Sequence, residues 1–177
     1  MIVLLDTSEN LDICQAELGV QVEQLLTPLT RFLPQRPDQH FAIDNGAFAG
    51  FNRASFERLL EREHDRLNLC RFVALPDVVG NARRTLEAFS YWFPKLKERG
   101  WPIALVAQDG LEDLPIPWGQ IDAVFVGGTT EWKMSKQAAD VIRTAKCLSR
   151  WVHVGRVNTP GRFEYFEELG VESIDGT

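Results

Sequence analysis

Polar residues follow several short apolar segments of this chain at the point where each segment stops. Asp44 follows Phe41-Ala42-Ile43, Asp77 follows Leu75-Pro76, Gln108-Asp109 follows an apolar run that ends at Ala107, Gly127-Gly128 follows Val126, and Asp175 follows Ile174. In a parallel α/β protein the carboxyl ends of the strands meet at one rim, and that rim is where such folds bind and transform substrates. The set predicts an active site built at one rim.

Carboxylates gathered at one rim can take different roles, because burial and like charge separate their pKa values. One carboxylate can attack an electrophilic carbon, such as an anomeric centre, while another donates or accepts a proton. A carboxylate beside an amide suits the edge of a purine, since the carboxylate accepts from N–H groups and the amide both donates and accepts. A flat ring would also need apolar walls, for which Phe48 and Val154 are candidates.

Each of these residues taken alone has a simpler structural interpretation. Asp44-Asn45-Gly46 is also a common turn sequence, and Pro76-Asp77 could end a strand and cap a helix. Gly127-Gly128 lacks the spacing of a dinucleotide fingerprint and could be a tight turn. Asp175 could be a solvated acid. The combination favours a site, because three carboxylates and an amide at successive strand ends exceed what turns require.

The segments that would position these residues alternate between β-rich runs and amphipathic stretches, which favours a parallel sheet with crossover helices. The predicted strands are Ile2–Leu5, Gln24–Thr27, Phe41–Ile43, Arg71–Leu75, Ile103–Ala107, Ala123–Val126, Trp151–Gly155 and Glu172–Ile174. Eight strands predict an α/β fold of the compact (β/α)8 TIM type, with short helices, as one domain over residues 1–177. Such barrels typically need about 250 residues, so an open doubly wound sheet of six or seven strands is the alternative.

Helical spacing marks the stretches between the strands. Apolar positions predict one helix from Ala82 to Leu96, another through Phe56 and Leu67, and a third that begins after Ser135 as N-cap. Thr159-Pro160 opens a further helix, since proline is tolerated at the first helical position. Pro115-Ile116-Pro117-Trp118 predicts an irregular connection in place of a helix.

Composition limits the class of protein. The chain has 177 residues, 45% apolar and 25% charged, as in an ordinary soluble domain. It has no apolar run of the roughly 20 residues that a membrane span needs, and its N-terminus does not resemble a secretion signal. We therefore expect a cytoplasmic location and no membrane partner. Three separated cysteines and three separated histidines support neither a disulfide framework nor a metal site.

The net charge of −6 argues against a nucleic-acid partner. The distribution of charge weakens that objection, because residues 133–162 carry seven basic side chains and the single acid Asp140. This segment could carry phosphates past the site, or it could be an ordinary solvated surface. Arg156, directly after a strand end, is a candidate for a substrate contact.

From Phe41 to Thr177 the chain resembles the tRNA-guanine transglycosylase superfamily, and most of all its small phage and bacterial DpdA-type branch, which inserts 7-deazaguanines into DNA. Asp44-Asn45-Gly46-Ala47-Phe48 is similar to the family's Asp-Ser-Gly-Gly-Phe motif. Residues 152–155 with Asn158-Thr159-Pro160 are similar to Met-Gly-Val-Gly-Thr-Pro, with Arg156-Val157 as an interruption. Residues 170–175 match the Gly-Ile-Asp-Met-Phe-Asp segment that carries the nucleophile.

The resemblance implies roles for these residues. Asp175 would be the nucleophile and Asp44 the general acid and base. Base recognition would fall to the following residues: Asp77 and Gln108 at the purine edge, the Gly127-Gly128 backbone at the purine carbonyl, and Phe48 and Val154 as walls.

The implied activity is base exchange, in which guanine in DNA is replaced by a preQ0-like 7-deazaguanine through a covalent glycosyl-aspartate, with no metal or redox cofactor. The partners would be DNA and the free base, in a bacterial or phage-infected cell, with a homodimer or a partner protein as an option. We expect tRNA to be a less suitable substrate, because the family's zinc subdomain has no counterpart after Asp175. The alternatives are a pentosyltransferase or N-glycosidase acting on free nucleotides, and a non-catalytic purine-binding module.

Overall fold

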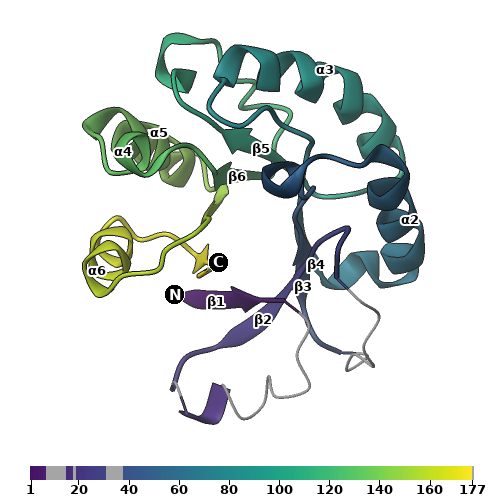
Figure 1. Cartoon of the computed structure of the whole chain (residues 1–177), viewed down its shortest axis with the longest axis horizontal. Helices are drawn as coiled ribbons and strands as arrows, with labels where there is room; N and C mark the ends of the chain where they lie inside the picture. The colour runs from purple at the N-terminus through teal and green to yellow at the C-terminus, as the bar shows by residue number, and fades with distance from the viewer. Residues whose placement is uncertain (7–14, 18, 31–37, 177) are drawn as a thin grey trace.

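The computed structural model of the chain describes residues 1–6, 15–17, 19–30 and 38–176. Its centre is a closed barrel of eight parallel strands in the sequential order β1 to β8 (Figure 1). The barrel closes because β1 pairs in parallel with β8, with Ile2 opposite Ser173 and Val3 opposite Ile174. This confirms the predicted (β/α)8 fold and excludes the open sheet.

The strands are short and agree closely with the apolar runs in the sequence. Their bounds are β1 Ile2–Leu5, β2 Val22–Leu26, β3 Phe41–Ile43, β4 Cys70–Ala74, β5 Ile103–Ala107, β6 Ala123–Val126, β7 Trp151–Val154 and β8 Ser173–Ile174. Most of their residues are buried on both faces, as is typical of a parallel barrel covered by helices.

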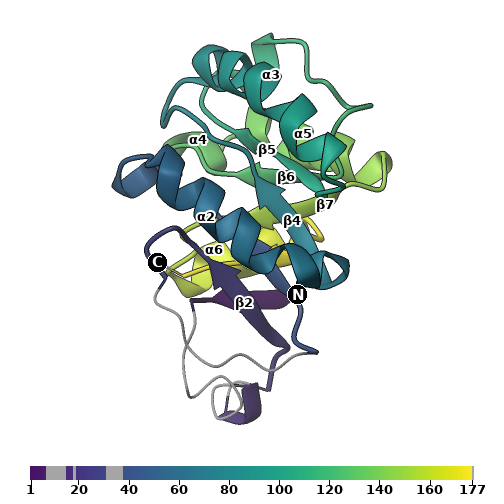
Figure 2. The same ribbon diagram turned by 90° about the vertical axis from the view of Figure 1, so that its right-hand side faces the viewer.

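The helices lie outside the strands, as Figures 1 and 2 show. They are α2 Arg53–Glu63, α3 Ala82–Glu98, α4 Thr130–Lys133, α5 Lys136–Cys147 and α6 Pro160–Glu168, with 3-10 helices η1 Ala47–Ala49, η2 His64–Leu69 and η3 Leu111–Asp113. Two predicted helix starts are confirmed. The Ser135 side chain caps α5 by accepting from the Ala138 N–H, and Pro160 is the first residue of α6.

A connection without a full helix helps the barrel fit into a short chain. Residues 108–122, between β5 and β6, contain only the single turn η3, so the irregular connection predicted at residues 115–118 is confirmed.

The helix predicted through Leu67 is wrong at its end. The α-helix stops at Glu63, and Leu67 lies in η2, where Arg66 departs from helical backbone angles.

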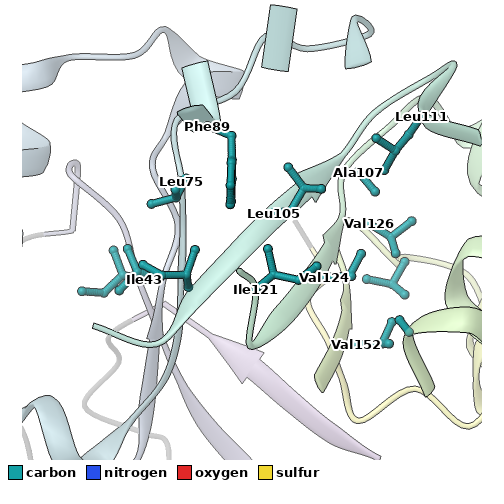
Figure 3. Packing of buried hydrophobic residues seen from close by; sticks show 14 of the residues in the cluster. Ile43, Leu75, Phe89, Leu105, Ala107, Leu111, Ile121, Val124, Val126 and Val152 are labelled. Atoms are coloured by element: carbon teal, nitrogen blue, oxygen red, sulfur yellow. The ribbon is translucent and has the colours of Figure 1, made fainter. Parts of the chain in front are cut away.

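The larger hydrophobic core lies between the barrel and the helices. Figure 3 shows residues of this layer, among them Leu105, Val124 and Val152 on the strands and Phe89 on α3. Each strand contributes alternate residues to this layer and directs the others into the barrel.

The inward-facing residues form a second cluster inside the barrel. It consists of Leu4, Leu25, Ala42, Phe72, Ala74, Ala104, Val106, Ala123 and Phe125. At the opposite end from the carboxyl rim, Arg71 binds Glu23 at 2.7 Å and lies 5.2 Å from the ring centroid of Trp151. These groups cover the amino end of the barrel.

Within the residues described, no helix has the length and apolar character needed to cross a lipid bilayer.

Candidate active site

A cavity of about 330 Å³ opens at the carboxyl rim of the barrel. Its lining includes most of the residues predicted from the sequence: Asp44, Phe48, Asp77, Gln108, Gly127, Arg156 and Asp175. Leu4, Leu25, Val106 and Phe125 form apolar parts of the wall. The volume lies at the lower end of the roughly 300–1,000 Å³ usual for small-molecule sites, so the cavity suits a small ring system.

Asp175 follows β8 directly and points into the barrel, with a residue exposure of 5%. Its Oδ1 accepts a 2.8 Å hydrogen bond from the backbone N–H of Arg156, and its Oδ2 lies 3.1 Å from Nε2 of His153. These two contacts hold the carboxyl group in one orientation. A carboxylate oriented in this way at a cavity wall can act as a nucleophile.

Asp44 follows β3 and has a different electrostatic environment. Protein surrounds the carboxyl group, and this burial raises its pKa from 3.8 to about 6, while a hydrogen bond from the Gly46 N–H lowers it and the charges of Asp175 and Asp77 raise it further. A carboxyl group with a pKa of about 6 exchanges a proton readily near neutral pH. The cavity therefore holds one carboxylate suited to attack and another suited to proton transfer.

Asp77 belongs to a network of amides at the ends of β3, β4 and β5. Its Oδ2 accepts from Gln108 Nε2 at 2.6 Å, and its Oδ1 accepts from Asn45 Nδ2 at 2.9 Å. Asn45 also donates to the Leu75 carbonyl, and Gln108 Oε1 accepts from the Gly80 N–H. Burial raises the pKa of Asp77, although both amide donors lower it. The network fixes an acceptor and an amide side by side at the cavity wall.

Two glycines let the backbone come close to these groups. A Cβ on Gly127 would lie 2.8 Å from Val106 Cγ1 and 3.2 Å from Gln108 Nε2. A Cβ on Gly155 would lie 2.9 Å from a ring carbon of Phe125 and 3.3 Å from Asp175 Oδ2. Side chains at these positions would press on the Gln108 amide and on the Asp175 carboxyl group.

The mouth of the cavity carries an aromatic ring covered by a cation. The Arg156 guanidinium lies 4.3 Å from the ring centroid of Phe48, whose residue exposure is 70%. The guanidinium also donates to the carbonyls of Gly127 and Gly128, at 3.2 and 3.4 Å. Arg156 has φ of 59°, a left-handed conformation that is uncommon for a residue with a side chain. The pair therefore forms a defined structure at the rim.

Two of the predicted contacts are not formed at the cavity. Val154 packs in the core between barrel and helices, because strand alternation turns His153 inward and Val154 outward, so its interpretation as a ring wall is wrong. Gly128 is buried against Trp132 and Asp109 and is absent from the cavity lining. Phe125, from β6, lines the cavity together with Phe48.

Three polar residues at or beneath the site are not predicted from the sequence. The motif that contains Asn45 assigns it no role, the spacing of the histidines argues only against a metal site, and no motif includes Asp6. Asp6 directly follows β1, lines the cavity and accepts from Thr30 Oγ1 at 2.6 Å. The polar-residue-after-strand pattern would have found Asp6, and strand alternation would have found His153.

The basic segment 133–162 does not form one uniform cationic surface. Lys133 is buried, donates to the Gly155 carbonyl at 2.5 Å, and has its pKa lowered to about 8 by desolvation and by Arg156. Arg143 pairs with Asp140, and Lys146 pairs with Glu172. Of the basic side chains in this segment, that of Arg156 lines the cavity.

Fold and site together define a (β/α)8 barrel with an acidic, partly apolar cavity at its carboxyl rim. No protein-family model matches the chain, and no curated protein matches it.

The chain is similar to solved structures at low sequence identity. One is the PaMucR phosphodiesterase in complex with c-di-GMP, with 17% identity and a TM-score of 0.43; the match covers 76% of this chain, which spans 58% of that one. Another is an HpcH/HpaI aldolase from Desulfitobacterium hafniense DCB-2, with 12% identity and a TM-score of 0.44, covering 98% of this chain and 84% of that one. Both are named as enzymes, and neither is named as a transglycosylase.

Proposed function

We propose that the protein is a base-exchange glycosyltransferase, a pentosyltransferase that replaces guanine in DNA with a free 7-deazaguanine through a covalent intermediate on Asp175. The observation that carries the proposal is that one cavity contains carboxyl groups in different environments, each suited to a different step. Asp175 accepts from the Arg156 N–H at one oxygen and contacts His153 Nε2 with the other, Asp44 has a pKa of about 6, and the Asp77–Gln108 pair offers a purine-reading edge.

The Asp77–Gln108 pair supports a guanine-like ligand. Guanine and 7-deazaguanines present N–H donors beside a carbonyl acceptor on one edge, and this pattern needs a carboxylate next to groups that donate. The backbone of Gly127 lies next to Gln108, where it can approach the ring without a side chain between them. Phe125 and Val106 provide apolar surface for the ring faces.

In the first half-reaction an Asp175 oxygen attacks C1′ of the nucleotide. The C1′–N9 bond breaks, its electron pair goes to N9, and the proton of Asp44 passes to the leaving guanine. With a pKa of about 6, roughly a tenth of the Asp44 population is protonated at pH 7. The product is a glycosyl-Asp175 ester, Asp44 as carboxylate, and free guanine.

In the second half-reaction the 7-deazaguanine occupies the vacated base site. The Asp44 carboxylate takes the proton from N9 of this base, N9 attacks C1′, and the ester bond breaks with its electron pair returning to Asp175. The cycle exchanges one base for another and regenerates both carboxyl groups, so it needs no redox partner.

The cavity mouth supports a polynucleotide substrate. A base must leave its stack to enter a closed barrel, and the exposed side chains of Phe48, Leu29 and Val79 at the cavity lining offer apolar contact for the exposed neighbouring bases. The Arg156 guanidinium beside them can contact a phosphate.

The test is release of guanine and incorporation of labelled guanine or 7-deazaguanine, measured on single-stranded DNA, double-stranded DNA, tRNA and free nucleotides. Wild type is compared with Asp175→Asn and with Asp140→Asn, an exposed carboxylate paired with Arg143 on α5. We expect exchange on DNA with wild type and Asp140→Asn, and loss in Asp175→Asn together with loss of the trapped covalent adduct.

The other outcomes separate the alternatives. Activity on free nucleotides alone would indicate a nucleotide pentosyltransferase, and release of guanine without incorporation of any base would indicate an N-glycosidase. Binding of guanine-type bases with equal behaviour of wild type and Asp175→Asn would indicate a purine-binding module. Any of these results would refute base exchange in DNA.

A further inference from the structure

We infer that His153 is a positioning residue for the nucleophile: it donates from Nε2 to Asp175 and is itself oriented by Ser173 and Trp151. The inference rests on the proposed function for its catalytic consequence, but its structural part is independent of that function. His153 lies inside the barrel on β7, and its residue exposure is 0%. Its ring connects the amino end of the barrel to the carboxylate at the rim.

The chain of hydrogen bonds has a defined direction. Trp151 Nε1 can only donate, so the 2.9 Å bond to Ser173 Oγ makes the serine oxygen an acceptor. An ionised Asp175 can only accept, so the 3.1 Å contact with His153 Nε2 requires a proton on that nitrogen. In a neutral imidazole Nδ1 is then an acceptor, and the Ser173 hydroxyl, 3.0 Å away, has its proton free to donate to it. Every group in the chain is satisfied.

The surrounding side chains fix the plane of the His153 ring. Phe125 and Phe72 lie 4.6 and 5.3 Å from it, centroid to centroid, at interplanar angles of 52° and 43°. Trp151, at the far end of this series of hydrogen bonds, lies under the Arg71 guanidinium, which is held by Glu23. The imidazole ring therefore cannot rotate without disrupting the packing inside the barrel.

The order Ser173, His153, Asp175 superficially resembles a hydrolase triad, but the burial of the serine excludes that role. Ser173 has a residue exposure of 0%, and it is absent from the cavity lining, whereas Asp175 lines the cavity. The group that meets a substrate is therefore the carboxylate, and the serine acts as the remote member that sets the imidazole tautomer.

The consequence concerns Asp175 in both half-reactions. A fixed donor at Oδ2 holds the carboxylate in one rotamer before attack. The same donor stabilises the negative charge that returns to Asp175 when the glycosyl ester breaks. These effects act on the reaction steps and leave the base-reading residues unchanged. Loss of the donor should therefore lower kcat and have little effect on binding of the base.

The kinetic test compares His153→Leu, which has no donor, with His153→Gln, whose side-chain amide reaches about as far as the imidazole Nε2. We expect His153→Leu to lower kcat for base exchange by about 10- to 100-fold, as for loss of a hydrogen bond to a charged group, with the KM for the free base changed less than about threefold. His153→Gln should recover most of the lost rate. Equal loss in both variants, or a change confined to KM, would overturn the inference.

A spectroscopic test does not depend on catalysis or on a substitution of His153. Nitrogen-15 NMR of the wild-type protein labelled at histidine should show Nε2 of His153 protonated and Nδ1 unprotonated at neutral pH. The Ser173→Ala variant should disturb the Nδ1 resonance, and Asp175→Asn should disturb Nε2, because each removes or changes a direct partner. An unprotonated Nε2 in the wild type would overturn the inference.

The two experiments also separate this inference from the proposed function. If wild type exchanges no base on any substrate but Nε2 is protonated toward Asp175, the proposed function fails and the structural part of the inference stands. If wild type exchanges bases and Asp175→Asn does not, while His153→Leu retains full kcat, the positioning role fails alone.

Discussion

The Gln108 side-chain amide donates a 2.6 Å hydrogen bond to the Asp77 carboxylate, and its own oxygen accepts from the Gly80 N–H at 2.8 Å. The second bond fixes which end of the amide faces Asp77. A rotated amide would place oxygen against carboxylate and leave Gly80 without its acceptor, which costs about 1–3 kcal/mol for each unsatisfied buried group. The pair therefore presents a constant pattern of acceptor and donor to a bound ring.

Removal of the Asp77 charge should impair recognition of the base more than chemistry. In Asp77→Asn the two N–H groups of a guanine edge lose their charged acceptor, so we expect the KM for the free base to rise by about 10- to 100-fold. Turnover at saturating base should change much less. The measurement is steady-state exchange at varied base concentration.

The control for this prediction is Asp113→Asn, an exposed carboxylate on the connection after β5. It should leave both kinetic constants unchanged. A fall in kcat without a change in KM for Asp77→Asn would assign Asp77 to the chemical step and contradict its role in recognition.

Two glycines near the carboxyl rim offer a sharp comparison of site and surface. A Cβ on Gly155 would meet Phe125 at 2.9 Å and Asp175 Oδ2 at 3.3 Å, whereas a Cβ on Gly161 in α6 meets nothing within 4 Å. Gly155→Ala should lower base exchange by at least about tenfold, because displacing the nucleophile by a fraction of an ångström is costly. Gly161→Ala should keep full activity and gain roughly 0.5–1 kcal/mol in the free energy of unfolding.

Exchange assays and urea unfolding check both variants in parallel. Retention of activity in Gly155→Ala, with normal stability, would show that Asp175 and Phe125 move freely and that the site is not preorganised as described.

The strands and the rim could be predicted from the sequence because their signals are local. Runs such as Ile103–Ala107 and Ala123–Val126 are apolar, bounded by polar or glycine residues, and coincide with β5 and β6. Asp44, Asp77, Gln108 and Asp175 directly follow such runs, so the barrel topology alone brings them together. Closure by pairing of β1 with β8 depends on non-local contacts and could only be inferred from the number of strands.

Side-chain direction was the harder part of the prediction. Val154 and His153 are neighbours, and a shift of one position in the alternation exchanges which of them faces the barrel interior. The interruption at Arg156-Val157 leaves the role of Val154 ambiguous in the sequence, and in the structure His153 faces the barrel interior while Val154 packs in the outer core. Asp6 follows β1 but belongs to no motif, so the sequence does not single it out.

Asp44 should make the protein less stable at neutral pH than a neutral residue would. Its pKa is about 6 in the folded state against an ordinary 3.8, so burial of the ionised form costs stability above pH 6, and the cost disappears below pH 3.8. Two pKa units correspond to about 3 kcal/mol, and contact with the open cavity reduces this to about 2 kcal/mol. Asp44→Asn should therefore be more stable by about that amount at pH 7.5.

Urea unfolding at several pH values checks the sign of this effect. The stability difference between Asp44→Asn and wild type should shrink as the pH falls from 6 to 4, while base exchange is lost at every pH. Asp140→Asn, which changes an exposed ion pair, should stay within about 0.5 kcal/mol of wild type. A destabilised Asp44→Asn at pH 7.5 would contradict the raised pKa.

The ring of Phe48 and the guanidinium of Arg156 should contribute to DNA binding and little to stability. Phe48 is 70% exposed, so Phe48→Ala should change the free energy of unfolding by less than about 0.5 kcal/mol. Loss of a stacking surface should weaken binding of single-stranded DNA by about 1–3 kcal/mol. Leu148→Ala, which truncates another exposed apolar residue, is the matched control.

For the cation, Arg156→Asn is the informative variant. Asparagine tolerates the left-handed backbone conformation at this position and keeps the backbone N–H that binds Asp175, so only the guanidinium is removed. We expect weaker binding at low salt and a decrease of about one in the slope of log affinity against log salt concentration, since one phosphate contact disappears. Fluorescence anisotropy with labelled single-stranded DNA at several salt concentrations measures both quantities. An unchanged slope together with reduced kcat would place Arg156 in the chemistry of the cavity and not in contact with the DNA backbone.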